Sequence, residues 1–338
     1  MKRISEIAKV LIDDELDYLK LSNSLKDYKN LLFEISEIQL NHEEHRNNIY
    51  LDSGKAIATE WAIRCIDDIM RTKQFVKGVF EAVKDVQQIK GNDPVYILYA
   101  GTGPFATLAL PLISLFDHTE IQFVFLEINP VSMAAVKKTI NELEADTYIH
   151  SFHECDATKF DIPSDIEIDI VLTECLQCAL AKEPQVSITF NLIKQLKKDV
   201  ILIPEDISLY IGLSDTTKIN HMSGSDSSEE INSHYTNSPA VYSLNKELVR
   251  NYRAKGPENG LSFEPVEVDF ESIGRDHFNQ VTINTEITVY KDNHIKYNES
   301  GLTIPNIILD IYDESPPKGI RTQYLVSNSP VLKTEFLN

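Results

Sequence analysis

The first part of the chain repeats apolar residues every three or four positions, which is the spacing of one face of a helix. The repeat covers residues 1 to about 48, with Asp, Glu and Lys between the apolar positions. It returns over residues 55–85 and is interrupted at Gly91-Asn92-Asp93-Pro94. Because no heptad is sustained, we expect the N-terminal helical segment, residues 1–49, to pack either on the body of the protein or on a second subunit.

Further along, the pattern changes to short, nearly continuous apolar runs that alternate with helical stretches. The runs cover residues 95–100, 121–126, 168–172 and 200–203. Strands that are apolar along their whole length are typical of a parallel sheet with helices on both faces. We therefore predict an α/β domain over residues 50–204.

Beyond Pro204 the helical pattern gives way to segments that alternate or are rich in β-branched residues. Residues 207–211, 281–290 and 307–311 are examples. Such segments favour an all-β unit, and we predict a β-barrel-like domain over residues 205–338.

The amino-acid composition limits which binding partners and which cellular compartment are expected for the protein. The 338 residues are 42% hydrophobic and 25% charged, as in ordinary globular proteins. No apolar run approaches the roughly 20 residues of a membrane helix. Phosphate contacts need a basic surface, so with a net charge of −20 duplex DNA or RNA is not an expected partner, and no membrane partner is expected either. The N-terminus turns polar within a few residues, and the four cysteines form no disulfide framework, which favours a reduced, cytoplasmic protein.

Candidate chemistry begins at the first two predicted strands. Gly101-Thr102-Gly103 lies between a strand and a helix, where glycines let the backbone approach a ligand closely. Glu127 ends the second strand, where a carboxylate can hold two ribose hydroxyls. Asp156 follows the third strand, where an acid can accept a hydrogen bond from an adenine amino group. Each feature alone also suits a surface turn, but their order predicts a site for a nucleoside cofactor.

Two glutamates, Glu174 and Glu183, lie nine residues apart just past the apolar run 168–172. In a straight helix, nine steps of about 100° would place them on opposite faces, so they act together only if the segment folds back as a loop. A loop at the C-terminal end of a buried strand is where open α/β sheets place ligands. Two carboxylates converging there suit a planar cation such as a guanidinium.

Together these residues resemble the protein arginine methyltransferases, which are S-adenosyl-L-methionine-dependent enzymes with a Rossmann-like domain followed by a β-barrel. The likeness covers roughly residues 50–213. It implies a Rossmann-like, seven-stranded methyltransferase sheet, S-adenosyl-L-methionine as cofactor, and a homodimer for which the N-terminal helices are a candidate surface. The matching positions are Tyr50-Leu51-Asp52-Ser53, which would cover the cofactor, Arg71, which would bind its methionine carboxylate, the glycine loop with Gly101 and Gly103, the ribose-binding Glu127, and the double-glutamate loop with Glu174 and Glu183.

The sequence departs from the family pattern in segments that bear on the identity of the methyl acceptor. The double-glutamate loop carries Cys175-Leu176-Gln177-Cys178 instead of Trp-Met-Gly-Tyr. The β region has no Thr-His-Trp element, for which Arg275-Asp276-His277-Phe278 is only a faint substitute, and the dimerisation arm is not recognisable near residues 214–250. We therefore expect a small guanidine, above all free L-arginine, at least as much as an arginine-containing peptide. The CxxC pair has no second pair at ligand spacing, so no metal site is expected.

The resulting hypothesis is methyl transfer from S-adenosyl-L-methionine to a guanidino nitrogen. Glu174 and Glu183 would hold the guanidinium and leave the lone pair of the attacking nitrogen available. Alternatives stay open: a protein arginine or another small-molecule amine as acceptor, a non-catalytic binding module with a methyltransferase fold, or a dehydrogenase. The missing third glycine of the dinucleotide fingerprint and the glutamate pair count against the dehydrogenase.

Overall fold

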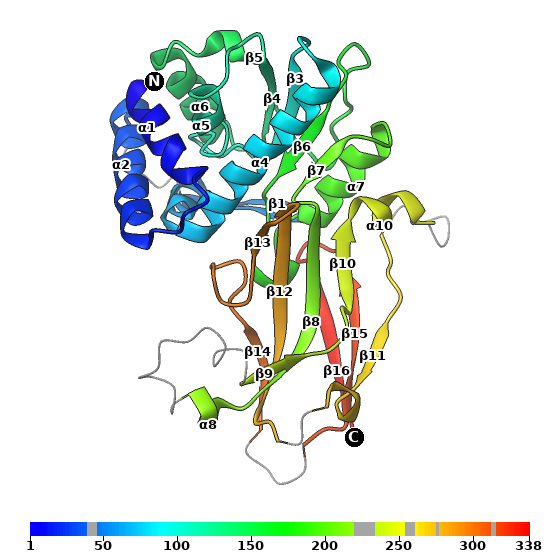
Figure 1. Ribbon diagram of the computed structural model, residues 1–338. Helices are drawn as coiled ribbons and strands as arrows, with labels where there is room; N and C mark the ends of the chain where they lie inside the picture. Colours follow the sequence, from blue (N-terminus) through cyan, green and yellow to red (C-terminus); the bar gives the residue numbers. More distant parts are fainter. Residues whose placement is uncertain (39–45, 220–233, 254–260, 275–276, 312–315) are drawn as a thin grey trace.

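A five-stranded parallel sheet forms the core of the first half of the computed structural model (Figure 1). Strands β3, β4 and β6 are almost wholly buried, because they lie inside the sheet and are apolar on both faces. The structure describes residues 1–38, 46–219, 234–253, 261–274, 277–311 and 316–338. Across the sheet the order is β5 (Ile149–Glu154), β4 (Ile121–Glu127), β3 (Val95–Ala100), β6 (Ile170–Thr173) and β7 (Ile201–Ile203).

Within the described residues this sheet has five strands, whereas the family resemblance implied seven. After β7 the chain passes through Pro204 directly into β8 (Asp206–Ser214). Strand β8 pairs antiparallel with β12 (Gln280–Tyr290) in a second sheet. The chain that could have extended the parallel sheet beyond β7 is therefore used in the other half of the protein.

The segment predicted as helix over residues 55–85 is largely helical from Thr59 onward, but its first two residues belong to a small hairpin. Strand β1 (Ile49–Leu51) pairs with β2 (Gly54–Ala56). Gly54 has φ 140°, and a Cβ on it would lie 2.9 Å from the backbone carbonyl carbon of Glu183, so the hairpin rests against the double-glutamate loop. Helices α3 (Thr59–Arg64) and α4 (Ile69–Lys90) follow, and α5 (Leu110–Ile113), α6 (Pro130–Glu142) and α7 (Gln185–Gln195) complete the cover of the sheet.

The N-terminal segment forms two helices rather than one, α1 (Lys2–Leu11) and α2 (Tyr18–Ser36). The break falls where Asp17 caps α2 by accepting a hydrogen bond from the backbone of Lys20. Both helices bury their apolar faces against the α/β domain: α1 contacts α4 and α5, and α2 contacts α6. Of the two expectations for this segment, packing on the body of the protein is the one that the structure shows.

The second half of the chain is antiparallel and β-rich, as predicted. Two sheets pack together, and the rings of Tyr242 and Tyr324 stack 4.4 Å apart between them. The α/β class with a β-barrel-like second half is therefore confirmed. The larger sheet contains β8, β12, β9 (Tyr235–Asn237), β10 (Tyr242–Asn245), β13 (Asn293–Ile295) and β14 (Asn306–Asp310), and the smaller contains β11 (Val266–Asp269), β15 (Gly319–Leu325) and β16 (Val331–Leu337); α8 (Thr216–Ile219) and α10 (Lys246–Asn251) lie in the connections.

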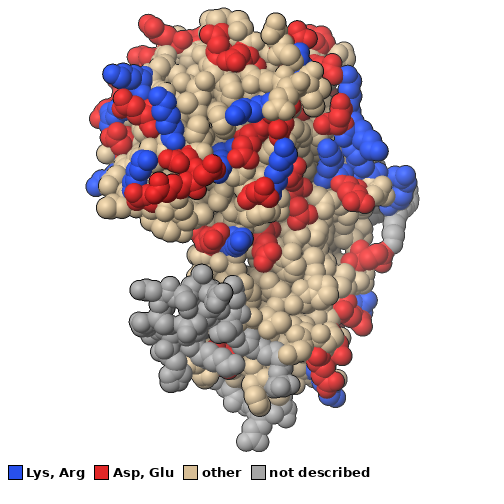
Figure 2. Space-filling view, in the orientation of Figure 1, with Lys and Arg blue, Asp and Glu red and all other residues tan. Residues whose placement is uncertain are grey.

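The two halves meet along α4. A Cβ on Gly78 of α4 would lie 2.7 Å from Val289 of β12, so the helix and the strand are in close contact. The hydroxyl of Tyr290 donates a hydrogen bond to Asp85 over 2.7 Å. On the face in Figure 2, acidic and basic side chains are interspersed over the domain with the parallel sheet, so the net negative charge is not gathered into one patch there. Among the described helices, none has the length and apolar character needed to cross a membrane.

Candidate functional site

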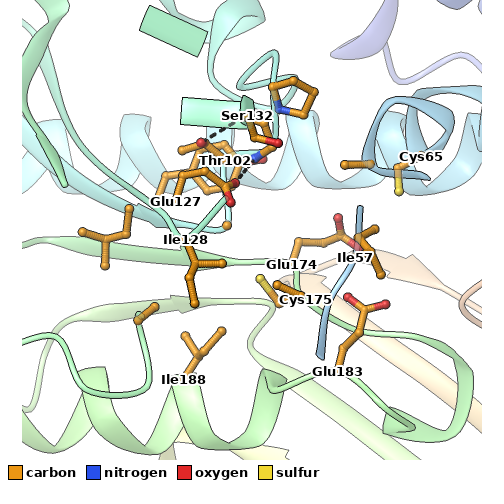
Figure 3. A pocket seen from close by; sticks show the side chains of 18 of the residues that line it. Ile57, Cys65, Thr102, Glu127, Ile128, Ser132, Glu174, Cys175, Glu183 and Ile188 are labelled. Atoms are coloured by element: carbon orange, nitrogen blue, oxygen red, sulfur yellow. Dashed lines mark hydrogen bonds between the residues drawn. The ribbon is translucent and has the colours of Figure 1, made fainter. Parts of the chain in front are cut away.

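One cavity lies at the C-terminal edge of the parallel sheet (Figure 3). Parallel strands end at the same edge, so residues that follow β3, β4, β5 and β6 come together there although they are far apart in the sequence. The cavity brings together all but one of the predicted site residues, namely Arg71, Gly101, Gly103, Glu127, Asp156, Glu174 and Glu183.

The glycine loop after β3 has a backbone that side chains would disturb. Gly101 has φ +81° and Gly103 has φ +60°. A Cβ on Gly101 would lie only 2.2 Å from Sγ of Cys175, whereas a Cβ on Gly103 would meet nothing closer than Ala62 at 3.6 Å. Gly101 is therefore required by a close approach inside the cavity, and the loop can present backbone groups to a ligand.

Glu127 stabilises this loop with the same carboxylate that was predicted to hold a ribose. Its Oε2 accepts a hydrogen bond from the backbone N–H of Gly103, and its Oε1 accepts one from Asn129, both over 2.8 Å. Burial raises the pKa of the Glu127 carboxyl, and these backbone donors offset part of that rise. Each oxygen keeps a second lone pair, so hydroxyl donors of a ligand can still be accepted.

Asp156 lies after β5 on the same wall. Its Oδ1 accepts hydrogen bonds from the backbone N–H and the hydroxyl of Thr158, over 2.9 and 2.7 Å. This turn fixes the carboxylate at the cavity wall, where it can accept a further hydrogen bond.

The double-glutamate loop folds back, as convergence of Glu174 and Glu183 requires. Gln185 closes its base by accepting from the backbone N–H of Cys175 over 2.8 Å and donating to the carbonyl of Thr173 over 3.1 Å. Its tip, η4 (Cys178–Leu180), is held by the barrel-like half, since the hydroxyl of Tyr324 donates to the carbonyl of Leu180 over 2.6 Å. Figure 3 shows the two glutamates at the same end of the cavity, away from Glu127.

The two carboxylates differ in their surroundings. Burial raises the pKa of Glu174, and the charge of Arg71 offsets only part of this rise. Burial and the neighbouring Glu174 raise the pKa of Glu183 to about 7. Near neutral pH, Glu183 therefore binds a proton readily. A cationic ligand that displaced this proton would lie beside the buried carboxylates of both Glu183 and Glu174.

Arg71 lies beside the pair at the N-terminal end of α4. Its Nη2 is 2.5 Å from Glu174 Oε2, and both side chains are nearly buried. Within the described residues, Glu174 Oε1 is buried and has no hydrogen-bond partner. A guanidinium group inside the protein thus occupies one oxygen of Glu174 and leaves the other oxygen for a ligand.

A second cavity meets the first at Glu183. The two share Ile57, Cys65, Arg71 and Glu183 as lining residues. The second cavity is also lined by Leu176, Gln177 and Cys178 of the double-glutamate loop. Its other lining residues were not singled out by the sequence patterns, namely Asn48, Lys55, Trp61, Gly301 and Leu302. The two cavities are therefore joined beside Arg71 and Glu183, and Glu174 faces the first of them.

The barrel-like half contributes Gly301 and Leu302 to the second cavity. Asp68 holds this segment: its Oδ2 accepts hydrogen bonds from the hydroxyl of Ser300 and the backbone N–H of Gly301, over 2.7 and 2.8 Å. The Arg275-Asp276-His277-Phe278 segment does not line either cavity in the described residues, and its first two residues lie outside them.

Tyr50 is the one predicted site residue that the cavity does not include. It lies in β1 and is 76% exposed. Its neighbour Leu51 lines the cavity instead, because successive side chains of a strand point to opposite faces. A role for Tyr50 in covering the cofactor stays a prediction.

Comparison with known proteins places the fold. No protein-family model matches the sequence, and no curated protein matches it. Among solved structures, protein arginine methyltransferase 10 of Arabidopsis thaliana shares 9% identity with a TM-score of 0.51, covering 81% of this chain and 96% of that one. A crystal structure of PRMT6 shares 11% identity with a TM-score of 0.50, covering 82% and 98%. A Trypanosoma brucei PRMT1 enzyme–prozyme complex with AdoHcy shares 10% identity, with a TM-score of 0.48 and coverage of 82% and 98%. At such identities the likeness is one of fold, and the chain has the fold of the protein arginine methyltransferases.

Proposed function

We propose that the protein is an S-adenosyl-L-methionine-dependent N-methyltransferase that acts on a guanidino nitrogen. The observation that carries this proposal is that two cavities meet at Glu183, with the buried carboxylate of Glu174 beside it in the first cavity. One cavity offers the glycine loop, Glu127 and Asp156 to a nucleoside, and the other leads outward past Trp61. A donor in the first cavity and an acceptor that enters through the second can thus meet beside Glu183.

The residues of the first cavity fit the proposed cofactor. Glu127 has lone pairs left for ribose hydroxyls, Asp156 has an oxygen left for an amino group, and Gly101 keeps the loop free of a side chain. Arg71 keeps N–H donors beyond the one used by Glu174, and these suit a carboxylate. When bound, S-adenosyl-L-methionine supplies an electrophilic methyl group on its sulfonium sulfur.

The chain's own contribution is to hold and orient the acceptor. Glu174 Oε1 and the carboxylate of Glu183 can each accept hydrogen bonds from a guanidinium. Their charges favour positive charge on the nitrogens that they bind and leave the third nitrogen the better nucleophile. Because both carboxylates are already fixed and buried, little reorganisation is needed during the transfer.

For the acceptor we propose free L-arginine or another small guanidine. In support, the described residues of the barrel-like half add only a glycine and a leucine, Gly301 and Leu302, to the second cavity. An arginine-containing peptide or another small amine are the alternative acceptors. A non-catalytic binding module is the alternative to an enzyme. Such a module would not require two buried carboxylates beside an arginine.

The test is to incubate the protein with labelled S-adenosyl-L-methionine and free arginine, agmatine or an arginine-containing peptide, and to identify methylated products by mass. Glu174→Gln and Glu183→Gln should each lower turnover by about 100-fold or more, the scale of losing a preorganised electrostatic contact. Glu286→Gln is the matched control, since Glu286 is a half-buried carboxyl that lines neither cavity. Near-normal turnover in either site variant would contradict the proposed role of the pair.

A homodimer also stays a proposal. The helices α1 and α2 use their apolar faces within the chain, but Leu16, Tyr18 and Leu19 beside the turn between them are exposed. Sedimentation of the wild type and of a Leu16→Ser, Leu19→Ser variant would show whether two copies associate through this turn. Association that survives both substitutions would exclude it.

A further inference from the structure

The outer part of the second cavity contains two hydrogen-bond donors on the chain that leads into and through the β1–β2 hairpin, Asn48 and Lys55. The hairpin is fixed against the double-glutamate loop, because Gly54 touches the backbone of Glu183 and the N–H of Lys55 donates to the carbonyl of Lys182 over 2.9 Å. The position of both donors relative to the glutamates is therefore built into the fold.

The amide of Asn48 has a defined orientation. Its Oδ1 accepts a hydrogen bond from the backbone N–H of Ala58 over 2.9 Å. The oxygen is thus in use, and the NH₂ group must lie on the other side of the amide, where it can donate.

The ammonium group of Lys55 is available in the same cavity. Within the described part of the chain it forms no hydrogen bond or ion pair, although the protein carries 52 acidic residues that could supply one. Lys55 and Glu183 line the same cavity, and the charge of Lys55 opposes part of the rise in the pKa of Glu183 that burial and Glu174 cause.

The charged residues that line the second cavity therefore include both an acidic and a basic group to which a ligand can bind. Arg71 is paired with Glu174, so Glu183 and Lys55 are the acidic and the basic residue without an ion pair among the described residues that line this cavity. A purely cationic ligand such as an arginine-rich peptide would be attracted by Glu183 and repelled by Lys55. A ligand with a guanidinium at one end and a carboxylate at the other would be matched at both ends.

We propose that Lys55 and Asn48 form a subsite for the carboxylate of the acceptor, so that the acceptor is a free amino acid with a guanidinium side chain. This inference rests on the proposed function, and it names the acceptor class. Lys55 and Asn48 then determine specificity, since they reject agmatine, which has the guanidinium without a carboxylate, and an arginine within a peptide.

The experiment compares kcat/KM for L-arginine, agmatine and a peptide with one internal arginine in the wild type and in Lys55→Met. The wild type should prefer L-arginine to agmatine by about 10- to 100-fold, the range expected for a charge-assisted contact. Lys55→Met should lose this preference through a lower kcat/KM for L-arginine, whereas kcat/KM for agmatine should stay the same or rise, because the repulsion by Lys55 is removed. Lys55→Arg should retain most of it, and Asn48→Ala should reduce it.

Lys182→Met is the matched control, because Lys182 is exposed on the double-glutamate loop and lines neither cavity. Calorimetry of L-arginine and agmatine with protein that has bound S-adenosylhomocysteine repeats the comparison without turnover. Equal loss for both ligands in Lys55→Met, or a wild type that prefers agmatine or the peptide, would overturn the subsite while leaving guanidine methylation intact. Absence of methyl transfer to every guanidine would instead overturn the proposed function itself.

Discussion

Arg71 Nη2 lies 2.5 Å from Glu174 Oε2, and this buried ion pair joins the N-terminal end of α4 to the end of β6. Asp68 caps the same helix through the backbone N–H of Arg71 and also binds Gly301 of the barrel-like half. The arginine is therefore held in place from two sides. It neutralises one glutamate of the pair and leaves the other, Glu183, with its pKa raised to about 7.

Removing the cation of this pair should destabilise the protein. In Arg71→Met, Glu174 would stay buried without its ionic partner, and we expect a loss of about 2–3 kcal/mol in the free energy of unfolding at pH 8, below the value for a fully enclosed pair. The loss should shrink at pH 5, where Glu174 can take up a proton. Urea unfolding at both pH values measures this, and Arg71→Met with Glu174→Gln should recover part of the loss. A loss that is equal at both pH values would contradict an electrostatic origin.

Glu183 should make the free energy of unfolding depend on pH. Its pKa is raised from 4.5 to about 7 by folding, so the folded state binds the proton more tightly than the unfolded state. The stabilisation by this proton is complete below pH 4.5 and is lost as the pH rises through 7. Glu183→Gln cannot ionise, so its advantage over the wild type should be up to about 3 kcal/mol larger at pH 8.5 than at pH 4.5. Chemical unfolding of both proteins across this range tests the difference.

The carboxyl of Glu183 should also make the binding of the acceptor depend on pH. The guanidinium of arginine stays charged throughout, so a change in affinity between pH 6 and 8 reports the protein. Because Glu183 must lose its proton before it can bind the cation, L-arginine should bind about 10-fold more weakly at pH 6 than at pH 8. In Glu183→Gln the affinity should be low and nearly flat with pH. Calorimetric titration gives both values, and an unchanged slope in the variant would assign the effect to another group.

Glu127 should be needed for cofactor binding for two reasons: it holds the glycine loop in place, and it is proposed to accept hydrogen bonds from the ribose hydroxyls. In Glu127→Gln, the side-chain NH₂ would have to face the backbone N–H of Gly103 or Asn129, each of which now donates to a carboxylate oxygen. We expect the Kd for S-adenosyl-L-methionine to rise by about 10- to 100-fold. Glu154→Gln is the control, since Glu154 is aligned with Glu127 on the next strand but is exposed. Equal binding by the two variants would show that Glu127 is dispensable.

The residues that follow strands were predictable from the sequence, and those brought in by tertiary contacts were not. Gly101, Glu127 and Glu174 follow apolar runs, and parallel strands must end at one edge, so their shared cavity could be inferred. Tyr50 and Leu51 show the limit of this reasoning. The side chain that enters the cavity depends on which face of β1 is turned inward, and nothing local decides that.

The second cavity shows the same limit more clearly. Lys55 reaches it through a hairpin that the helical periodicity concealed, and Gly301 reaches it through a hydrogen bond to Asp68, over 200 positions earlier in the chain. The sheet likewise has five strands in the described residues, because the chain after β7 pairs in the other half of the protein. Pairing partners at such distances are not encoded in any local pattern.

The two glycines of the loop after β3 should respond differently to the same substitution. Gly101→Ala combines a φ of +81° with a Cβ 2.2 Å from Cys175 Sγ, so Cys175 would have to shift and the cofactor cavity would be distorted. Gly103→Ala has a φ of +60°, which non-glycine residues adopt at a cost of about 1–2 kcal/mol, and its Cβ would meet only Ala62 at 3.6 Å. Cofactor binding should therefore be lost in Gly101→Ala and only weakened in Gly103→Ala. Gly101→Ala combined with Cys175→Ala removes the clashing sulfur and should regain part of the affinity; if it regains none, backbone strain at residue 101 is the cause rather than the clash with Cys175.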